Sequence, residues 1–154
     1  MPRIYHRWPY NRPMTVARHS QTFPARRDAL PQVDAFLGEV CSGAGLGRDT
    51  CLRLTLLVEE LFTNTVVHGH GTDSEAPVRI ECEVSPGRVA LTYEDTGPAH
   101  DPFARVITPD AGAGVEERPV GGLGVLLVSE MAQQVEYQRT GDRNRISLVI
   151  ATRS

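Results

Sequence analysis

Lysine is absent from this chain of 154 residues, so all 16 of its basic side chains are arginine. Without lysine the chain cannot form a phosphate-binding loop of the Walker type, which places a lysine on the phosphates. Cysteine is scarce as well. The 3 cysteines lack C-x-x-C spacing, so we expect neither a disulfide framework nor a zinc site.

Long apolar runs are also missing, since no run approaches the roughly 20 residues that would span a bilayer. The basic N-terminus lacks the apolar stretch of a signal peptide. The net charge of -3 gives no reason to expect nucleic acid or an anionic membrane as a partner. We therefore expect a cytoplasmic protein that binds neither.

The length fits one domain, for which we expect residues 16–154, preceded by an arm of residues 1–15. The first 27 residues contain six arginines and no acidic residue. This basic segment could dock on an acidic partner or fold over a second subunit. A flexible tail is the alternative, because chain termini are commonly disordered.

Apolar spacing and turn residues predict the secondary structure. In chain order we expect a strand at 16–23, helices at 26–41 and 49–68, strands at 78–84 and 88–94, a helix at 122–132, and strands at 135–139 and 145–150. Short turns at 85–87 and 141–142 indicate antiparallel hairpins. The order predicts an α+β fold: a two-layer α/β sandwich with a mixed, mostly antiparallel sheet and helices on one face.

The helix predicted at 49–68 needs an N-cap and a buried stripe, and the sequence offers both. Asp49 is a plausible N-cap. For the stripe we expect Leu52, Leu56, Leu57, Leu61 and either Phe62 or Val67.

Polar residues of this helix form a candidate site. Glu60 and Asn64 are four residues apart and should share a face, with His68 one turn further. An amide oxygen beside a carboxylate suits Mg²⁺, and the carboxylate could accept a proton from a hydroxyl group. The alternative is an ordinary solvated stripe on an amphipathic helix. His70 adds a second histidine near His68, but no third ligand for zinc is evident.

Two further segments carry candidate binding groups. Asp95 follows the apolar residues of a strand and could accept a hydrogen bond from the amine of a flat heterocycle, which Gly97 would let approach closely. The alternative is a plain Asp-Thr-Gly turn. The glycines of 121–124 precede an apolar helix, whose free N–H groups could bind an anion, although a flexible hinge remains the alternative.

Together these motifs resemble those of the Bergerat-fold ATPases of the anti-sigma-factor serine kinase type, over about residues 16–151. Glu60-x-x-x-Asn64, continued by residues 66–69, looks like the N-box of that family. Residues 94–98 with 101–103 look like its adenine-reading box. Residues 121–125 and the tail 143–148 also fit, whereas His100 stands where the family usually has an aromatic residue.

The resemblance implies roles for individual residues of an ATP site, first for the catalytic base, the metal ligand and the groups around the purine. Glu60 would be the catalytic base and Asn64 the Mg²⁺ ligand. Asp95 would read the adenine amine, with Gly97 under the ring. Ser147 would touch the adenine side through water.

At the phosphate end, the resemblance implies that Gly122, Leu123 and Gly124 belong to the phosphate-binding loop. Arg118 would steady the γ-phosphate in place of a lysine, His68 would lie near the phosphates, and residues 103–120 would form a lid.

The function implied by the resemblance is that of a protein serine/threonine kinase that uses ATP and Mg²⁺. Its substrate would be a STAS-type anti-anti-sigma protein, its second partner a sigma factor or similar regulator, and it could act as a homodimer. One alternative is a module that sequesters a sigma factor and only responds to ATP. The catalytic domain of a histidine kinase is less favoured, because prolines near His6 and His19 argue against a long acceptor helix.

Overall fold

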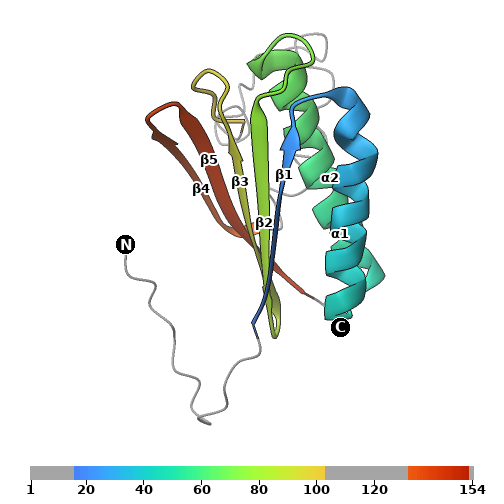
Figure 1. Ribbon diagram of the computed structural model, residues 1–154. Coiled ribbons are helices and arrows are strands. Elements are labelled where there is room, and N and C mark those ends of the chain that lie inside the picture. Colours follow the sequence, from blue (N-terminus) through green and yellow to red (C-terminus); the bar gives the residue numbers. More distant parts are fainter. Residues whose placement is uncertain (1–15, 103–131, 153–154) are drawn as a thin grey trace, which may run out of the picture.

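The computed structural model describes residues 16–102 and 132–152 (Figure 1). Its regular elements are β1 (Ala17–Pro24), a 3₁₀ turn η1 (Arg27–Ala29), α1 (Leu30–Ala44), α2 (Arg48–Asn64), a π-helical turn η2 (Thr65–Gly69), β2 (Pro77–Ser85), β3 (Arg88–Asp95), β4 (Ala132–Thr140) and β5 (Arg143–Ala151). The predicted arm, the glycine segment 121–124, Arg118 and nearly all of the predicted lid and third helix lie outside the described residues.

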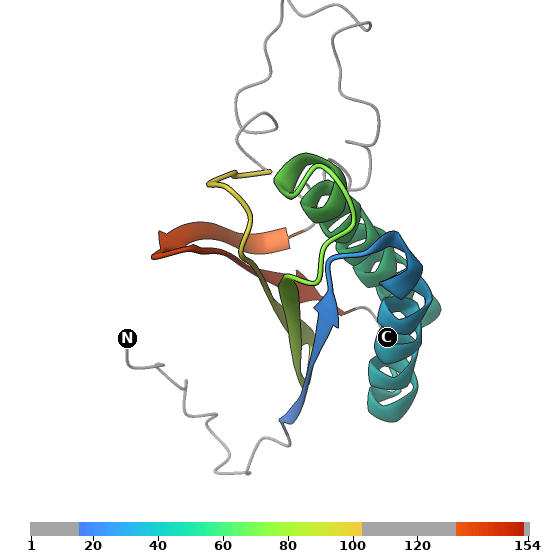
Figure 2. The same ribbon diagram turned by 45° about the horizontal axis from the view of Figure 1, so that its top comes forward.

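The strands form one sheet in the order β1-β2-β3-β5-β4. Every pairing between neighbours in this sheet is antiparallel, so the described sheet is not mixed. Both helices lie on one side of it (Figure 2). The predicted α+β sandwich of two layers is confirmed.

The core lies between the helices and the sheet because the strands alternate, as predicted. In β2 the side chains of Val78, Ile80, Cys82 and Val84 are buried, and β3 buries Val89, Leu91 and Tyr93 in the same way. Full burial of one such aliphatic side chain contributes about 1.5–3 kcal/mol. Repeated along the strands, this burial holds the two layers together.

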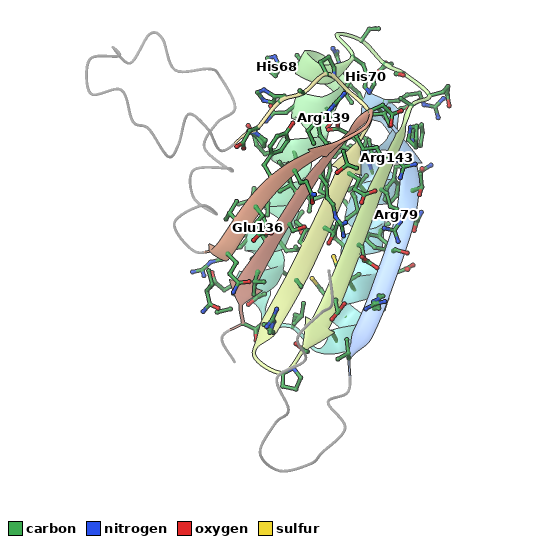
Figure 3. The ribbon with its side chains drawn as sticks, turned by 90° about the vertical axis from the view of Figure 1, so that its left-hand side faces the viewer. His68, His70, Arg79, Glu136, Arg139 and Arg143 are labelled. Carbon is green, nitrogen blue, oxygen red and sulfur yellow. The ribbon has the colours of Figure 1, made fainter. Side chains whose placement is uncertain are left out.

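The opposite face of the sheet is charged, and Figure 3 shows Arg79, Arg143 and Glu136 there. Glu94 lies between Arg143 and Arg145, with N···O distances of 3.6 and 3.5 Å. Such exposed pairs contribute at most about 1 kcal/mol each. The helices therefore cover the apolar face of the sheet, and its charged face remains in water.

The helix predicted at 26–41 begins later and ends later than expected. The turn η1 precedes α1, which runs through Gly43 to Ala44. Gly45 ends it in the left-handed conformation, at φ 63°. Glycine adopts that conformation at little cost, whereas Gly43 is compatible with ordinary helical geometry.

For α2, both the N-cap and part of the buried stripe were wrongly predicted. Gly47 is the N-cap, and Asp49 in the first turn instead pairs with Arg53 at 3.0 Å. The side chains of Leu52, Leu56 and Val67 are exposed. Those that face the core are Leu54, Leu57, Val58, Leu61 and Phe62. Apolar residues occur on more than one face of this helix, so their spacing alone does not decide which face meets the sheet.

The orientation of α2 on the sheet predicts that truncating two of its leucines will destabilise the fold by different amounts. Leu57 is 0% exposed and Leu52 is 58% exposed. We expect Leu57→Ala to lower the free energy of unfolding by about 3 kcal/mol, because it leaves a cavity, and Leu52→Ala by less than about 0.5 kcal/mol. Equilibrium urea unfolding measures both, and equal losses would contradict the observed register.

Candidate functional site

The end of α2 and the end of β3 meet through the buried side chain of Thr65. This residue begins the π-helical turn, a distortion found frequently at functional sites. Its hydroxyl oxygen lies 2.8 Å from Asp95 Oδ2, 2.6 Å from the Tyr93 hydroxyl and 3.0 Å from the carbonyl oxygen of Leu61. One side chain thus joins the helical layer to the sheet.

The direction of these hydrogen bonds follows from the protons available. Burial raises the pKa of the Tyr93 phenol well above its ordinary value, and the neighbouring Asp95 carboxylate adds to this effect. The phenol therefore stays protonated and donates to Thr65. The threonine hydroxyl has a single hydrogen, and donation to the Asp95 carboxylate gives the stronger, charge-assisted bond.

The carboxylate of Asp95 receives two more donors on its other oxygen. The backbone N–H of Gly97 lies 3.0 Å from Oδ1, and the Asn144 amide lies 2.8 Å from it. A carboxylate offers about four acceptor positions. Donors from residues 16–102 and 132–152 use three of them, which leaves one position on Oδ2 within this part of the chain.

Asn144 is buried, with 4% of its surface exposed, and it fixes the segment after β3. Its amide nitrogen also donates to the carbonyl oxygens of Gly97 at 3.2 Å and Pro98 at 2.8 Å. Its own oxygen accepts from the Tyr137 hydroxyl at 2.5 Å and from the backbone N–H of His100 at 3.3 Å. This one side chain therefore sets the course of residues 95–100.

Four residues of this network were not among the site residues expected from the sequence: Thr65, Tyr93, Asn144 and Tyr137. A signal for Asn144 exists in the pattern of β5. It is the polar member of a core-facing series that continues with Ile146, Leu148 and Ile150. A polar side chain at such a position requires partners.

Ser147 lies on the other face of β5, because side chains alternate along a strand. It is opposite Thr92 on one side and Glu136 on the other. The geometry thus places Ser147 away from Asp95, and Asn144 is the residue of β5 that lies beside this carboxylate.

Two glycines allow the loop after β3 to approach the π-helical turn. A Cβ atom built on Gly97 would lie 3.2 Å from the Cα of Gly69. That contact is tighter than most real Cβ contacts, and its partner is backbone, so a side chain at this position would push the two segments apart. The expected closeness of Gly97 to a bound ring stays a prediction.

A narrow cleft opens between these groups. Its walls are formed by Leu61, Asn64, Thr65, Gly69, Tyr93, Asp95, Pro98, His100, Pro102, Asn144 and Ile146. It contains about 330 Å³ of empty space, including the part open to solvent, which is at the lower end for ligand pockets. The space in which a water molecule can sit corresponds to about one water site, so a flat ring would have to widen the cleft on entry.

Asn64 lines this cleft, whereas Glu60 and His68 are not among its walls. Glu60 lies one turn before Asn64 in α2 and is half-buried. Burial raises the pKa of the Glu60 carboxyl above its ordinary value, and the charge of His68 partly opposes this. His68 itself is exposed within the π-helical turn (Figure 3). Glu60 is therefore a better proton acceptor than an ordinary surface glutamate.

The described residues hold neither a ready-made metal cluster nor a helix that could span a membrane. Within residues 16–102 and 132–152, no group of three or more His, Cys, Asp or Glu side chains converges on a metal position. Among the same residues, no helix is long and apolar enough to cross a membrane. A divalent ion at Asn64 would therefore not find three such side chains among the described residues.

The hydrogen bonds of Asn144 predict a large effect on stability. We expect Asn144→Ala to lower the free energy of unfolding by about 2–3 kcal/mol, because it leaves buried polar groups without a partner. Ser147→Ala, on the other face of the same strand, is the matched control and should cost less than about 0.5 kcal/mol. Chemical unfolding of both variants measures this. A near-neutral Asn144→Ala would show that the network does not stabilise the fold.

Comparison with known proteins identifies the family of this chain. Residues 23–150 match the model of the histidine kinase-like ATPase domain. No curated protein matches significantly. The fold is similar to that of the RsbU and RsbW domains of Rv1364c from Mycobacterium tuberculosis, at a TM-score of 0.62 and 16% sequence identity. That match covers 88% of this chain but 32% of the other, so the chain spans about a third of its structural neighbour.

The family model covers most of the chain, and the cleft lies where the end of α2 meets the end of β3. This protein belongs to the histidine kinase-like ATPase domain family.

Proposed function

We propose that this chain is a protein serine/threonine kinase of the anti-sigma type, which uses Mg-ATP to phosphorylate a STAS-type antagonist protein. One observation carries the proposal: Asn64 from the end of α2 and Asp95 from the end of β3 line the same cleft, with Thr65 holding them together. The N-box and the adenine-reading box were inferred from segments about 30 residues apart, and the fold brings them side by side.

At the purine end, the residues fit an adenine ring. The unused acceptor position of Asp95 Oδ2 would take the hydrogen bond of the exocyclic amine. Leu61, Tyr93 and Ile146 supply apolar surface for the ring. A hydrogen bond to a charged group contributes about 1.5–3 kcal/mol, so Asp95 would provide much of the discrimination for adenine.

At the phosphate end, the amide oxygen of Asn64 fits a hard cation. Mg²⁺ is held by few protein ligands together with phosphate oxygens and water, which agrees with a single amide from Asn64 in the wall of the cleft. We assign Arg118, Gly122, Leu123 and Gly124 to the phosphates, and residues 103–120 to a lid, on the resemblance of their motifs alone.

The phosphorylation itself needs a proton acceptor near the nucleotide, and Glu60 is our candidate. Mg-ATP supplies the transferable phosphoryl group. The Glu60 carboxylate would orient the hydroxyl of the incoming serine or threonine and take its proton. Its raised pKa brings its basicity closer to the working pH, which favours general base catalysis.

The partners are proposed from the resemblance and from the fold. The structural neighbour contains an RsbW domain beside an RsbU domain. For this chain we propose a sigma factor, a STAS-type antagonist and a second copy of the chain as binding partners.

Nucleotide binding is tested by calorimetry with ATP, with and without Mg²⁺. We expect Asp95→Asn to weaken ATP binding at least about 10-fold, because the bond to the adenine amine loses its charge. Asn64→Ala should keep Mg²⁺-free binding and lose the gain that Mg²⁺ gives. Ser147→Ala, on the far face of the sheet, should bind like the wild type. Unchanged binding in Asp95→Asn and Asn64→Ala would refute the site.

Phosphate transfer is tested with radiolabelled ATP and a STAS-type substrate. We expect Glu60→Gln to bind ATP normally and to transfer phosphate about 10²–10⁴-fold more slowly. Glu59→Gln is the matched control, because the Glu59 carboxyl faces Asp34 of α1.

The pH dependence of transfer gives a second readout. Only the ionised carboxylate accepts a proton, so wild-type transfer should fall as the pH drops through a pKa above the usual 4.5 of glutamate. Glu59→Gln should retain this fall. Normal transfer in Glu60→Gln would remove Glu60 as the base. ATP-dependent binding of a sigma factor without any transfer would instead favour the sequestering module.

A further inference from the structure

Two of the three cysteines meet at the turn between α1 and α2. Cys41 lies near the end of α1 and Cys51 in the first turn of α2. Both contact the backbone of Leu46 between them. Its N–H donates to the carbonyl oxygen of Cys41 at 3.0 Å, and its carbonyl oxygen accepts from the Cys51 thiol at 3.8 Å.

The two thiols are close enough to affect each other. Burial raises the pKa of the Cys41 thiol to about 12, and a side-chain hydrogen bond with Cys51 adds to this. Both cysteines are free and only partly buried, so a small oxidant can reach them. Cys82 of β2 is different, because it is 0% exposed.

We propose that Cys41 and Cys51 form a reversible disulfide between α1 and α2 when the protein meets a peroxide. Their spacing in the sequence gave no reason to expect a disulfide, and the fold brings them together. This inference does not rest on the proposed kinase activity.

The chemistry balances with hydrogen peroxide as the oxidant. The Cys51 sulfur, as thiolate, attacks one peroxide oxygen; an S–O bond forms, the O–O bond breaks, and hydroxide leaves with the thiol proton as water. The Cys41 sulfur then attacks the Cys51 sulfenic acid. An S–S bond forms, the S–O bond breaks, and hydroxide leaves with the Cys41 proton as a second water.

The order of these two steps follows from the surroundings of each thiol. Burial raises the pKa of the Cys41 thiol to about 12, which makes it the less reactive of the two toward peroxide, because only a thiolate attacks. Cys51 therefore reacts with the oxidant, and Cys41 resolves the product.

The disulfide would act far from the cleft. Cys51 and Asn64 are 13 residues apart in α2, which corresponds to about 20 Å along the helix axis. Figure 1 shows the α1–α2 turn and the end of β3 at opposite ends of the molecule. We therefore expect oxidation to stabilise the fold without blocking nucleotide binding.

Peptide mapping tests the bond directly. The folded protein is treated with hydrogen peroxide, its free thiols are alkylated after denaturation, and trypsin is added. Arg48 separates the two cysteines, so the disulfide joins the tryptic peptides 28–48 and 49–53. We expect this pair in the wild type and in Cys82→Ala, its disappearance after dithiothreitol, and its absence in Cys51→Ser.

Thermal unfolding provides an independent readout. Oxidation should raise the unfolding temperature of the wild type by at least about 5 °C, since the bond restricts the unfolded chain. It should not raise that of Cys51→Ser. The proposal is wrong if the wild type yields only sulfinic acid, only disulfides between chains, a bond to peptide 80–88, or unmodified cysteines.

Discussion

The hydrogen bond from Thr65 to Asp95 is the constraint on which the site depends. It joins the helical layer to the sheet where both layers carry buried polar groups. In such surroundings an unpaired carboxylate or phenol costs several kcal/mol, so the two layers are stable only when these groups meet. The position of α2 relative to β3 is therefore set by hydrogen bonding at this end and by apolar packing along the rest of the helix.

Three local features make that hydrogen bond possible. The chain leaves α-helical geometry at Thr65, which places the hydroxyl over the end of β3. Gly69 and Gly97 let the two loops touch without side chains between them. Asn144, from a strand much later in the chain, closes the ring of donors around Asp95. Each feature comes from a different element, and the cleft exists because all three act on the same few atoms.

The two ends of α2 carry different functional groups. Its C-terminal end carries Glu60 and Asn64 beside the cleft, and its first turn places Cys51 against α1. The apolar stripe between them packs on the sheet and keeps the ends about 20 Å apart. The disulfide proposed at one end would thus alter the stability of the fold while the geometry of the other end is retained.

The sequence by itself determined the strands of the two hairpins, the two-layer α+β class and the family, since strand alternation and short polar motifs are local properties of the chain. It also predicted Asn64 and Asp95 as site residues from motif spacing, and the fold places both in the walls of one cleft.

It could not determine which face of α2 meets the sheet, since Leu52, Leu54 and Leu56 are equally apolar and only packing distinguishes them. Nor could it select Asn144 over Ser147, or bring Cys41 to Cys51. Those outcomes depend on strand register and helix rotation. Both are decided in three dimensions, where the core must be filled and the buried polar groups must find hydrogen-bond partners at the same time.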